Sequence, residues 1–266
     1  MNWNHEQTGL PRAAATAAAA ARLLVATDFD GTLSEIVEDP KRAVAHRRAL
    51  EALRSLALSR DTAVVVISGR GVADLRSRVP HREIAVVGGH GAEFETDLFL
   101  RPSGSAEALE RARGWIGGLT RGLPGSFIEH KPLSMALHFR SESGVSEAMV
   151  ALRRYADAEP ALVLREGKRV AELCLRGPDK GDAYRAFRAA VDAGVFIGDD
   201  STDEAVFGAM PAGDVGAKVG PEATRAAHRL AGVPEVAAFL RLLAQKRAGL
   251  QQTQLAEVRD RLVERT

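Results

Sequence analysis

Residues 23–33 read Leu-Leu-Val-Ala-Thr-Asp-Phe-Asp-Gly-Thr-Leu, and the rest of the chain is organised around this stretch. An apolar run typical of a buried strand stops at two carboxylates, Asp28 and Asp30. Because an unpaired buried carboxylate is costly, we expect both to lie where the strand ends, at the edge where open α/β sheets bind ligands. There they can share a Mg²⁺ ion, a hard cation that prefers oxygen ligands. A plain strand followed by an acidic turn is the alternative.

Composition is that of an ordinary globular protein. The chain has 266 residues, of which 45% are hydrophobic and 27% charged, enough for one large domain or two modest ones. A net charge of +1 gives no reason to expect nucleic acid or a membrane surface as partner. The single cysteine, Cys174, excludes an internal disulfide framework and favours a reducing, cytoplasmic location. No apolar run approaches the ~20 residues that span a bilayer.

Short apolar runs recur along the chain and alternate with amphipathic segments. Runs of this kind predict a parallel sheet covered by helices on both faces, which is a doubly wound α/β core. Each of the first four predicted strands ends in polar or glycine residues, and in such a sheet these ends share one edge. The predicted strands are Leu23–Asp28, Ala63–Ser68, Ile84–Gly88, Val195–Asp199 and Val215–Val219; the predicted helices between them are Arg47–Leu58, Val72–Val79 and Asp182–Val191.

The middle of the chain has a different order, α-β-β-α-β-β, with hairpins and no βαβ crossover. This order predicts an α+β cap domain inserted into the core. We expect an Ala-rich leader at 1–22, as an N-terminal helix or a frayed segment, a discontinuous core at 23–102 and 178–245, the cap at 103–177 with hinges at 102–104 and 177–178, and a helical tail at 246–266. Residues 233–266 as a whole are expected to form two helices.

Grouped at one edge, the strand ends indicate phosphoryl transfer. Asp28 is a candidate nucleophile, because a carboxylate can form an acyl phosphate and divide one displacement into two steps. Asp30 can offer its backbone carbonyl to Mg²⁺, while its side chain, kept partly protonated by its surroundings, gives a proton to the leaving group and later takes one from water.

Two further strand ends and a helix complete this predicted site. Ser68 can hydrogen-bond a phosphoryl oxygen, and Lys180 can set an ammonium against the phosphate and Asp28. Asp199 is the preferred direct ligand of the metal. We expect Asp200 and Asp203 to contact the metal-binding residues and not the metal itself, since Mg²⁺ takes few protein carboxylates and keeps several waters.

Together these motifs resemble the haloacid dehalogenase superfamily of phosphatases, and within it the trehalose-6-phosphate phosphatases. The superfamily motifs are the Asp-Phe-Asp-Gly-Thr-Leu of residues 28–33, Ser-Gly-Arg at 68–70, Lys180 and Gly-Asp-Asp-Ser-Thr-Asp-Glu at 198–204. The narrower resemblance depends on residues 88–93, 129–134, 138–140 and 166–168. It implies Mg²⁺-dependent hydrolysis of trehalose 6-phosphate, with Asp28 as nucleophile, Asp30 as acid and base, and Asp199 as the third metal ligand.

The same resemblance implies that the cap closes over the sugar, which Glu129, Lys131 and Glu166 would hold. Arg70 either binds substrate or caps the following helix, and substrate binding is slightly favoured. For His90, a structural role between the two domains is expected, and a role as catalytic base is the alternative. Cys174, in an apolar strand, is expected to be inert core.

Other functions stay open on the sequence alone. The same chemistry fits another sugar phosphate, such as sucrose phosphate or mannosyl-3-phosphoglycerate, and a phosphomutase would pass the phosphoryl group back to substrate. A non-catalytic sugar-phosphate-binding module is disfavoured, because a protein that only binds its ligand does not need a nucleophile and a general acid two residues apart. The expected partner is a small-molecule substrate, with a trehalose-phosphate synthase as a possible functional partner.

Overall fold

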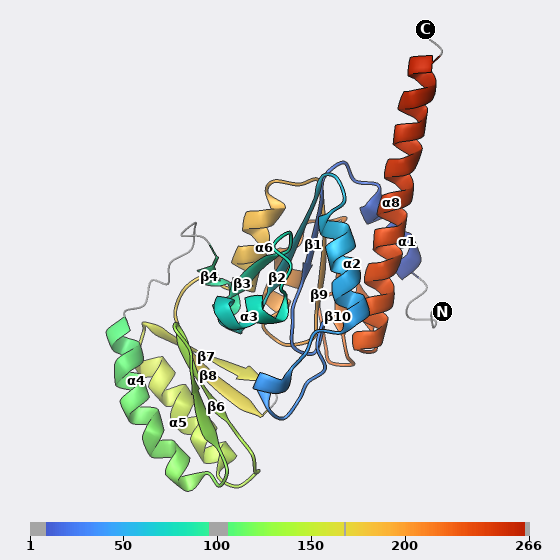
Figure 1. Cartoon of the computed structure of the whole chain (residues 1–266). Helices are drawn as coiled ribbons and strands as arrows, with labels where there is room; N and C mark the ends of the chain where they lie inside the picture. The colour runs from blue at the N-terminus through green and yellow to red at the C-terminus, as the bar shows by residue number, and fades with distance from the viewer. Residues whose placement is uncertain (1–8, 96–105, 168, 264–266) are drawn as a thin grey trace.

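The structure, a computed structural model, describes residues 9–95, 106–167 and 169–263. The chain forms a seven-stranded sheet with strand order β11-β10-β9-β1-β2-β3-β4 and a separate four-stranded sheet with order β5-β6-β8-β7. The two sheets lie in separate parts of the molecule, the smaller one beside α4 and α5 (Figure 1). The predicted fold class is therefore confirmed: a doubly wound α/β core and a second, α+β unit.

The larger sheet is parallel except where β3 meets β4. Its strands begin and end at β1 Leu23–Thr27, β2 Thr62–Ile67, β3 Ala85–Gly88, β4 Glu93–Phe94, β9 Ala193–Gly198, β10 Val215–Val219 and β11 His228–Leu230. Strand β1 lies at the centre, between β2 and β9. This places the residues that follow β1 beside those that follow its two neighbours.

Helices cover both faces of this sheet. Leu23 and Val25 belong to the core cluster shared with α1, α2, α3 and α8, whereas Leu24 and Ala26 pack with α6 and α7. Strand β1 is therefore buried on both sides, which explains why its sequence is continuously apolar. The helices of the core are α1 Leu10–Ala18, α2 Arg47–Ala57, α3 Val72–Arg78, α6 Lys180–Arg188, α7 Glu204–Ala209 and α8 Val233–Val263, with 3₁₀ turns η2 Pro40–Arg42 and η3 Gly89–Gly91.

The smaller sheet is antiparallel, with helices on one face. Met135 and Leu137 of β6 and Leu173 of β8 pack against these helices. The alternate residues Ala136, His138 and Glu172 lie on the opposite face, as the two-residue period of a strand requires. Its elements are α4 Ala106–Leu119, η4 Thr120–Gly122, β5 Phe127–His130, β6 Ser134–His138, α5 Val145–Ala158, β7 Leu162–Gly167 and β8 Val170–Leu175.

At the C-terminal end the structure differs from the sequence expectation, and at the N-terminal end it has the helix that was one of the two alternatives. The tail predicted as two helices is one helix, α8, because Gly249 alone does not interrupt a run rich in Leu, Ala, Gln and Arg. Within the expected leader, α1 packs against α8 with Leu10 and Ala14 fully buried (Figure 1). The predicted hinge at 102–104 and Lys168 lie outside the described residues. Among the helices that the structure describes, none is long and apolar enough to cross a membrane.

Candidate active site

A pocket of about 380 Å³ lies between the carboxyl ends of the parallel strands and the open face of the smaller sheet. Its floor comes from the core and includes most of the predicted site residues. Its roof comes from β5, β6, β8 and the turn between β7 and β8. The predicted site residues that line it are Asp28, Asp30, Ser68, Arg70, Glu129, Lys131, Lys180, Asp199 and Asp200. The sequence analysis thus singled out residues on both walls, although on the roof only Glu129 and Lys131 were among them.

Lys180 is the centre of the charge network on the floor. Its side chain is 1% exposed, and Nζ lies 3.0 Å from Asp28, 2.8 Å from Asp203 and 3.9 Å from Asp200. The lysine is the first residue of α6, which Asp179 caps by accepting a hydrogen bond from the backbone of Asp182. This cap fixes where the helix begins and thereby where the ammonium lies.

Burial and crowding set the proton affinities of these groups. Burial raises the pKa of Asp28 well above its ordinary value, and Lys180 acts in the opposite direction. Burial, with the charges of Asp200 and Asp203, raises the pKa of Asp199 to about 7. Burial alone would lower the pKa of Lys180, but Asp200, Asp203 and Asp28 together hold it well above its ordinary value. The floor therefore has more carboxylates than its lysine can balance.

This excess of carboxylate fits a divalent cation. Ligand oxygens of Asp28, Asp199 and Asp203 lie within 4.8 Å of one another. Asp199 Oδ1 is buried and accepts no hydrogen bond from any residue that the structure describes. Both oxygens of Asp203, in contrast, are used, one by Lys180 and one by the backbone of Asp200. Among the described side chains, Asp28 and Asp199 have oxygens left for a cation, and their role as Mg²⁺ ligands stays a prediction.

Gly31 makes room for this arrangement. Its φ of +79° is a left-handed conformation, and a Cβ there would lie 2.0 Å from Asp199 Oδ2. A glycine after Asp30 therefore lets the loop that follows β1 approach the carboxylate that follows β9.

Lys218, on β10, is a buried residue of the site that the sequence analysis did not single out. Its Nζ donates to the backbone carbonyl of Asp199 and, at 3.3 Å, to that of Asp200. It thereby fixes the turn that presents Asp199. The signal was available, because a lysine in an apolar strand must find partners for its ammonium.

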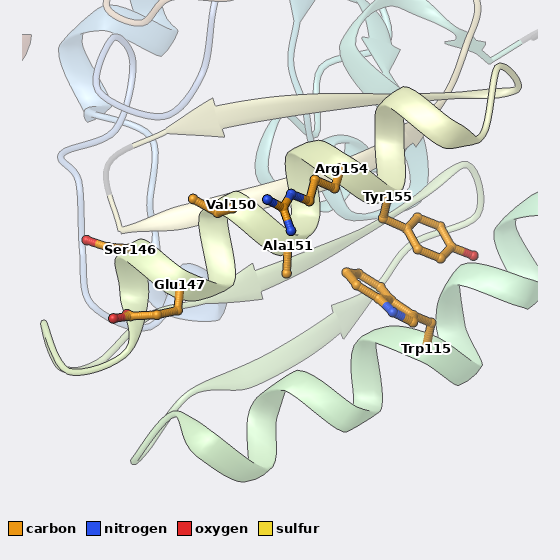
Figure 2. Close-up of a pocket in the computed structure, with 7 residues that line it drawn as sticks. All are labelled: Trp115, Ser146, Glu147, Val150, Ala151, Arg154 and Tyr155. Atoms are coloured by element: carbon orange, nitrogen blue, oxygen red, sulfur yellow. The ribbon is translucent and has the colours of Figure 1, made fainter.

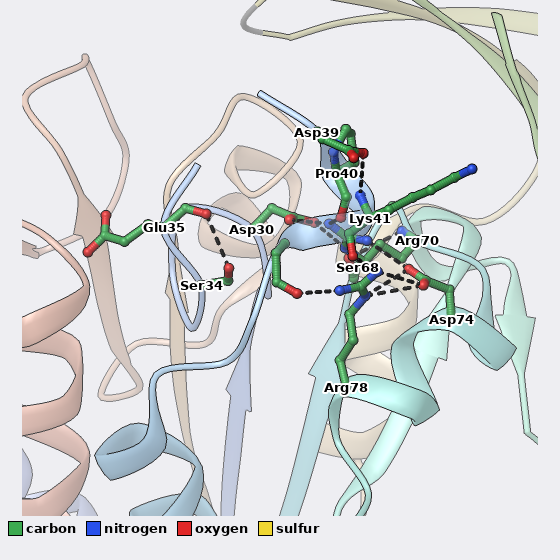
Figure 3. Close-up of polar contacts among 12 residues, drawn as sticks. Asp30, Ser34, Glu35, Asp39, Pro40, Lys41, Ser68, Arg70, Asp74 and Arg78 are labelled. Atoms are coloured by element: carbon green, nitrogen blue, oxygen red, sulfur yellow. Dashed lines mark hydrogen bonds and ion pairs between the residues drawn. The ribbon is translucent and has the colours of Figure 1, made fainter. Parts of the chain in front are cut away.

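Asp30 and Arg70 form a direct pair (Figure 3). Nε of Arg70 donates to Oδ2 of Asp30 at 2.7 Å, and Nη2 donates to Oδ1 at 2.6 Å. Both oxygens of Asp30 therefore face the guanidinium of Arg70, and the proton-transfer role expected of Asp30 stays a prediction. The expectation that Arg70 binds substrate is likewise left as a prediction.

Ser68 and His90 complete the floor and connect it to the roof. Ser68 is 1% exposed, and its hydroxyl accepts a hydrogen bond from the backbone N–H of Arg70 at 3.2 Å. His90 is buried, and its Nε2 lies 3.1 Å from Glu172 of the smaller sheet. This contact between the two units agrees with the structural interpretation of His90.

On the roof, Lys131 and Glu172 lie at the centre. Nζ of Lys131 donates to Glu172 at 2.9 Å and to the backbone carbonyl of Gly69, in the core, at 3.1 Å. Burial alone would raise the pKa of Glu172, but Lys131 and His90 hold it well below its ordinary value. Glu172 was missed by the sequence analysis, although an acidic residue within an apolar strand is itself a signal.

The two other residues predicted to contact the sugar, Glu129 and Glu166, point in different directions. Glu129 lines the pocket and lies 3.0 Å from Nε2 of His138. Glu166 is exposed and pairs with Arg153 of α5 at 2.8 and 2.9 Å, so in this structure its carboxylate is held away from the pocket. A turn position in the sequence could not distinguish these two directions.

A second, larger hollow of about 650 Å³ lies on the helical face of the smaller unit (Figure 2). Trp115 of α4 and Tyr155 of α5 stack there with ring centroids 4.2 Å apart. Glu147 and Arg154 are its charged residues, and it has no group of carboxylates. The smaller pocket, with its nucleophile candidate and lysine, is therefore the candidate active site.

The comparisons with known proteins agree with this geometry. The sequence profile described as trehalose-phosphatase matches residues 26–228. The chain is 34% identical over 227 residues to trehalose-6-phosphate phosphatase of Escherichia coli (strain K12), covering 81% of this chain and 84% of that protein. This chain belongs to the trehalose-phosphatase family. It is thus a phosphatase, a phosphoric monoester hydrolase.

Other members of the trehalose-phosphatase family differ in length or in sequence. Trehalose-phosphate phosphatase of Mycobacterium marinum is 34% identical and covers 82% of this chain, which spans 60% of that protein. Among solved structures, the C-terminal domain of trehalose-6-phosphate phosphatase from C. albicans superposes with a TM-score of 0.81 at 22% identity, covering 92% of this chain and 99% of that one. The Aspergillus fumigatus enzyme gives 0.62 at 25% identity, covering 90% and 97%. The C. albicans likeness shows the fold.

Proposed function

We propose that this phosphatase hydrolyses trehalose 6-phosphate to trehalose and phosphate, with Mg²⁺ as cofactor and a phosphorylated Asp28 as intermediate. The observation that carries the proposal is the contact of Lys180 with Asp28 at 3.0 Å, next to the unsatisfied carboxylate of Asp199. The names of the relatives support the substrate. Trehalose biosynthesis in the cytoplasm is the expected setting, and a bifunctional synthase/phosphatase relative from Thermoproteus tenax suggests coupling to a synthase.

The first half-reaction uses Asp28 and Asp30. A carboxylate oxygen of Asp28 attacks phosphorus, and the bond from phosphorus to the sugar oxygen breaks. Asp30 donates a proton to the departing alkoxide, while Lys180 balances charge on the phosphoryl oxygens and the hydroxyl of Ser68 donates to one of them. A bound Mg²⁺ supplies further charge neutralisation at the phosphoryl group.

The second half-reaction regenerates the enzyme. Asp30, now ionised, takes a proton from a water molecule, which attacks phosphorus and displaces the carboxylate of Asp28. Asp28 then returns to its starting form and phosphate leaves. The site therefore needs the side chain of Asp30 directed at the same position in both steps, where the leaving-group oxygen lies in the first and the attacking water in the second.

The roof supplies the proposed sugar site. We infer that residues 103–177 act as a cap that closes on the core through the contacts of Lys131 with Gly69 and of Glu172 with His90. Glu129 and Lys131 then face the sugar hydroxyls. A site with buried polar groups of this kind discriminates strongly against analogues that leave them unpaired.

Phosphate release from a panel of sugar phosphates tests the proposal. We expect trehalose 6-phosphate to be turned over far faster than glucose 6-phosphate or sucrose phosphate, and EDTA to abolish turnover until Mg²⁺ is added back. Equal rates on trehalose 6-phosphate and glucose 6-phosphate would refute the substrate. Full activity in EDTA would refute the cofactor.

A further inference from the structure

We propose that Arg70 and Asp74 are positioning residues for Asp30, and that together they direct the side chain that transfers the proton. The proposal rests on the role of Asp30 in the proposed function and assigns Arg70 differently from the sequence expectation of substrate binding. The network is drawn in Figure 3.

The guanidinium of Arg70 is held on all sides by the chain itself. Nε and Nη2 form a two-pronged contact with Asp30, Nη1 donates to Asp74 at 2.7 Å, and Nη2 also donates to the backbone carbonyl of Pro40 at 2.9 Å. These contacts use four of the five N–H donors of an arginine. The ring of Phe29 lies beneath, 5.3 Å from the guanidinium carbon. Little of the group is left for a substrate.

Asp74 fixes this guanidinium from its far side. It lies in the first turn of α3, four residues after Arg70, and both of its oxygens also accept hydrogen bonds from Arg78. Burial alone would raise the pKa of Asp74, but its hydrogen bonds from Arg78 and Arg70 hold it below its ordinary value, so it is an anion in the neutral range. Arg78 in turn donates to the backbone carbonyls of Lys41 and Ala43.

The result is a rigid chain from helix α3 to the reacting group. A two-pronged arginine–carboxylate contact fixes the plane of the carboxylate as well as its distance. Asp30 is 36% exposed and faces the pocket, so without Arg70 its side chain would be free to rotate. A misdirected carboxylate slows proton transfer without weakening substrate binding.

This role has a specific kinetic signature. Trehalose leaves as a strongly basic alkoxide and needs a proton, whereas p-nitrophenolate leaves without one. In the first turnover, the phosphorylation of Asp28 should therefore depend on Asp30 for the sugar substrate only. Later turnovers include hydrolysis of the intermediate, in which Asp30 acts as a base for both substrates. The first-turnover rate is accordingly the quantity to compare.

The experiment measures first-turnover rates with Mg²⁺, by rapid quench, for trehalose 6-phosphate and p-nitrophenyl phosphate. Arg70→Met and Asp74→Asn are compared with Asp30→Asn, and with Glu51→Gln as a matched control. Glu51 pairs with Arg47 at 2.8 Å across one turn of α2, as Asp74 pairs with Arg70, and neither Glu51 nor Arg47 lines the pocket. We expect Asp30→Asn to slow release of trehalose by at least ~100-fold, the usual contribution of a general acid.

Arg70→Met and Asp74→Asn should slow release of trehalose by about 10-fold or more, with less than about 3-fold effect on p-nitrophenolate and on the KM of either substrate. Glu51→Gln should change neither rate. Equal losses on both substrates, no loss, or a raised KM at unchanged rate would overturn the positioning role. If Asp30→Asn itself lacks the selective loss, the proposed function of Asp30 fails instead. Should Arg70→Met not fold, Asp74→Asn still decides, because Asp74 is 44% exposed.

Discussion

The acidic floor of the pocket predicts how stability should depend on pH and Mg²⁺. In the metal-free protein, burial and neighbouring charges raise the pKa of Asp199 to about 7 and that of Asp203 to about 6. A carboxyl group whose pKa is raised by folding stabilises the folded protein while it is protonated. That contribution is present at low pH and is lost as the pH rises through the folded pKa. Without metal, the unfolding free energy should therefore fall between pH ~5 and ~8.

The size of this fall follows from the two shifts. Between these pH values the linkage relation gives a loss of about 3 kcal/mol from Asp199 and about 1 kcal/mol from Asp203. Asp28, whose pKa is also raised, adds a contribution of the same sign. Bound Mg²⁺ stabilises the ionised carboxylates and removes the fall. Saturating Mg²⁺ should consequently stabilise the protein by several kcal/mol more at pH ~8 than at pH ~5.

Urea unfolding followed by circular dichroism, in EDTA and in saturating Mg²⁺, measures both quantities. Burial lowers the pKa of His90, which adds a slope of opposite sign, and a parallel series with Asp199→Asn cancels it. In EDTA the fall of the variant should be smaller than that of the wild type by about 3 kcal/mol, the contribution of Asp199. An unfolding free energy that is flat or rises with pH in EDTA, or an equal effect of Mg²⁺ at both pH values, would refute the reasoning.

Three further predictions concern single side chains. Lys180→Met should lower the unfolding free energy by about 3–5 kcal/mol in urea titrations, since it leaves buried carboxylates unpaired; a loss below about 1 kcal/mol would contradict the burial of its charge. Lys131→Ala should reduce phosphate release from trehalose 6-phosphate far more than from p-nitrophenyl phosphate, and an equal loss on both would remove it from the sugar site. Glu166→Ala should leave the KM for trehalose 6-phosphate unchanged, because its carboxylate pairs with Arg153; a large rise in KM would show that this pair opens to bind sugar.

The fold could be predicted best for the strands that are buried on both faces, because burial there requires apolar residues. The continuous apolar runs of β1 and β2 could only be strands covered on both faces, and their polar ends then had to meet at one edge. The strands β4 and β11, of two and three residues, were too short to show a period. Residues 233–266 were predicted as two helices, whereas Val233–Val263 form the single helix α8, since no proline follows its first turn.

The site could be predicted as a set of residues but not as a set of contacts. The topology of the sheet brings together Asp28, Lys180 and Asp199, because each lies at the end of a strand or helix at the same edge. Their proximity could therefore be predicted once the strands and helices were identified. Glu172 and Glu166 lie on neighbouring strands of one hairpin, yet only Glu172 faces the pocket. In the β7–β8 register Glu166 lies opposite Ala171, which packs against the helices, so Glu166 points toward α5 and away from the pocket. That register depends on how the two strands pair, which the sequence pattern near the turn did not show.

The central claim is that Asp28 carries the phosphoryl group during turnover. Reduction of an acid-quenched reaction with borohydride converts an aspartyl phosphate to homoserine, and peptide mapping then finds the residue that was modified. We predict homoserine at position 28 with trehalose 6-phosphate and Mg²⁺, and none in the Asp28→Asn variant. Modification at another residue, or turnover of the wild-type enzyme with no homoserine at position 28, would contradict it.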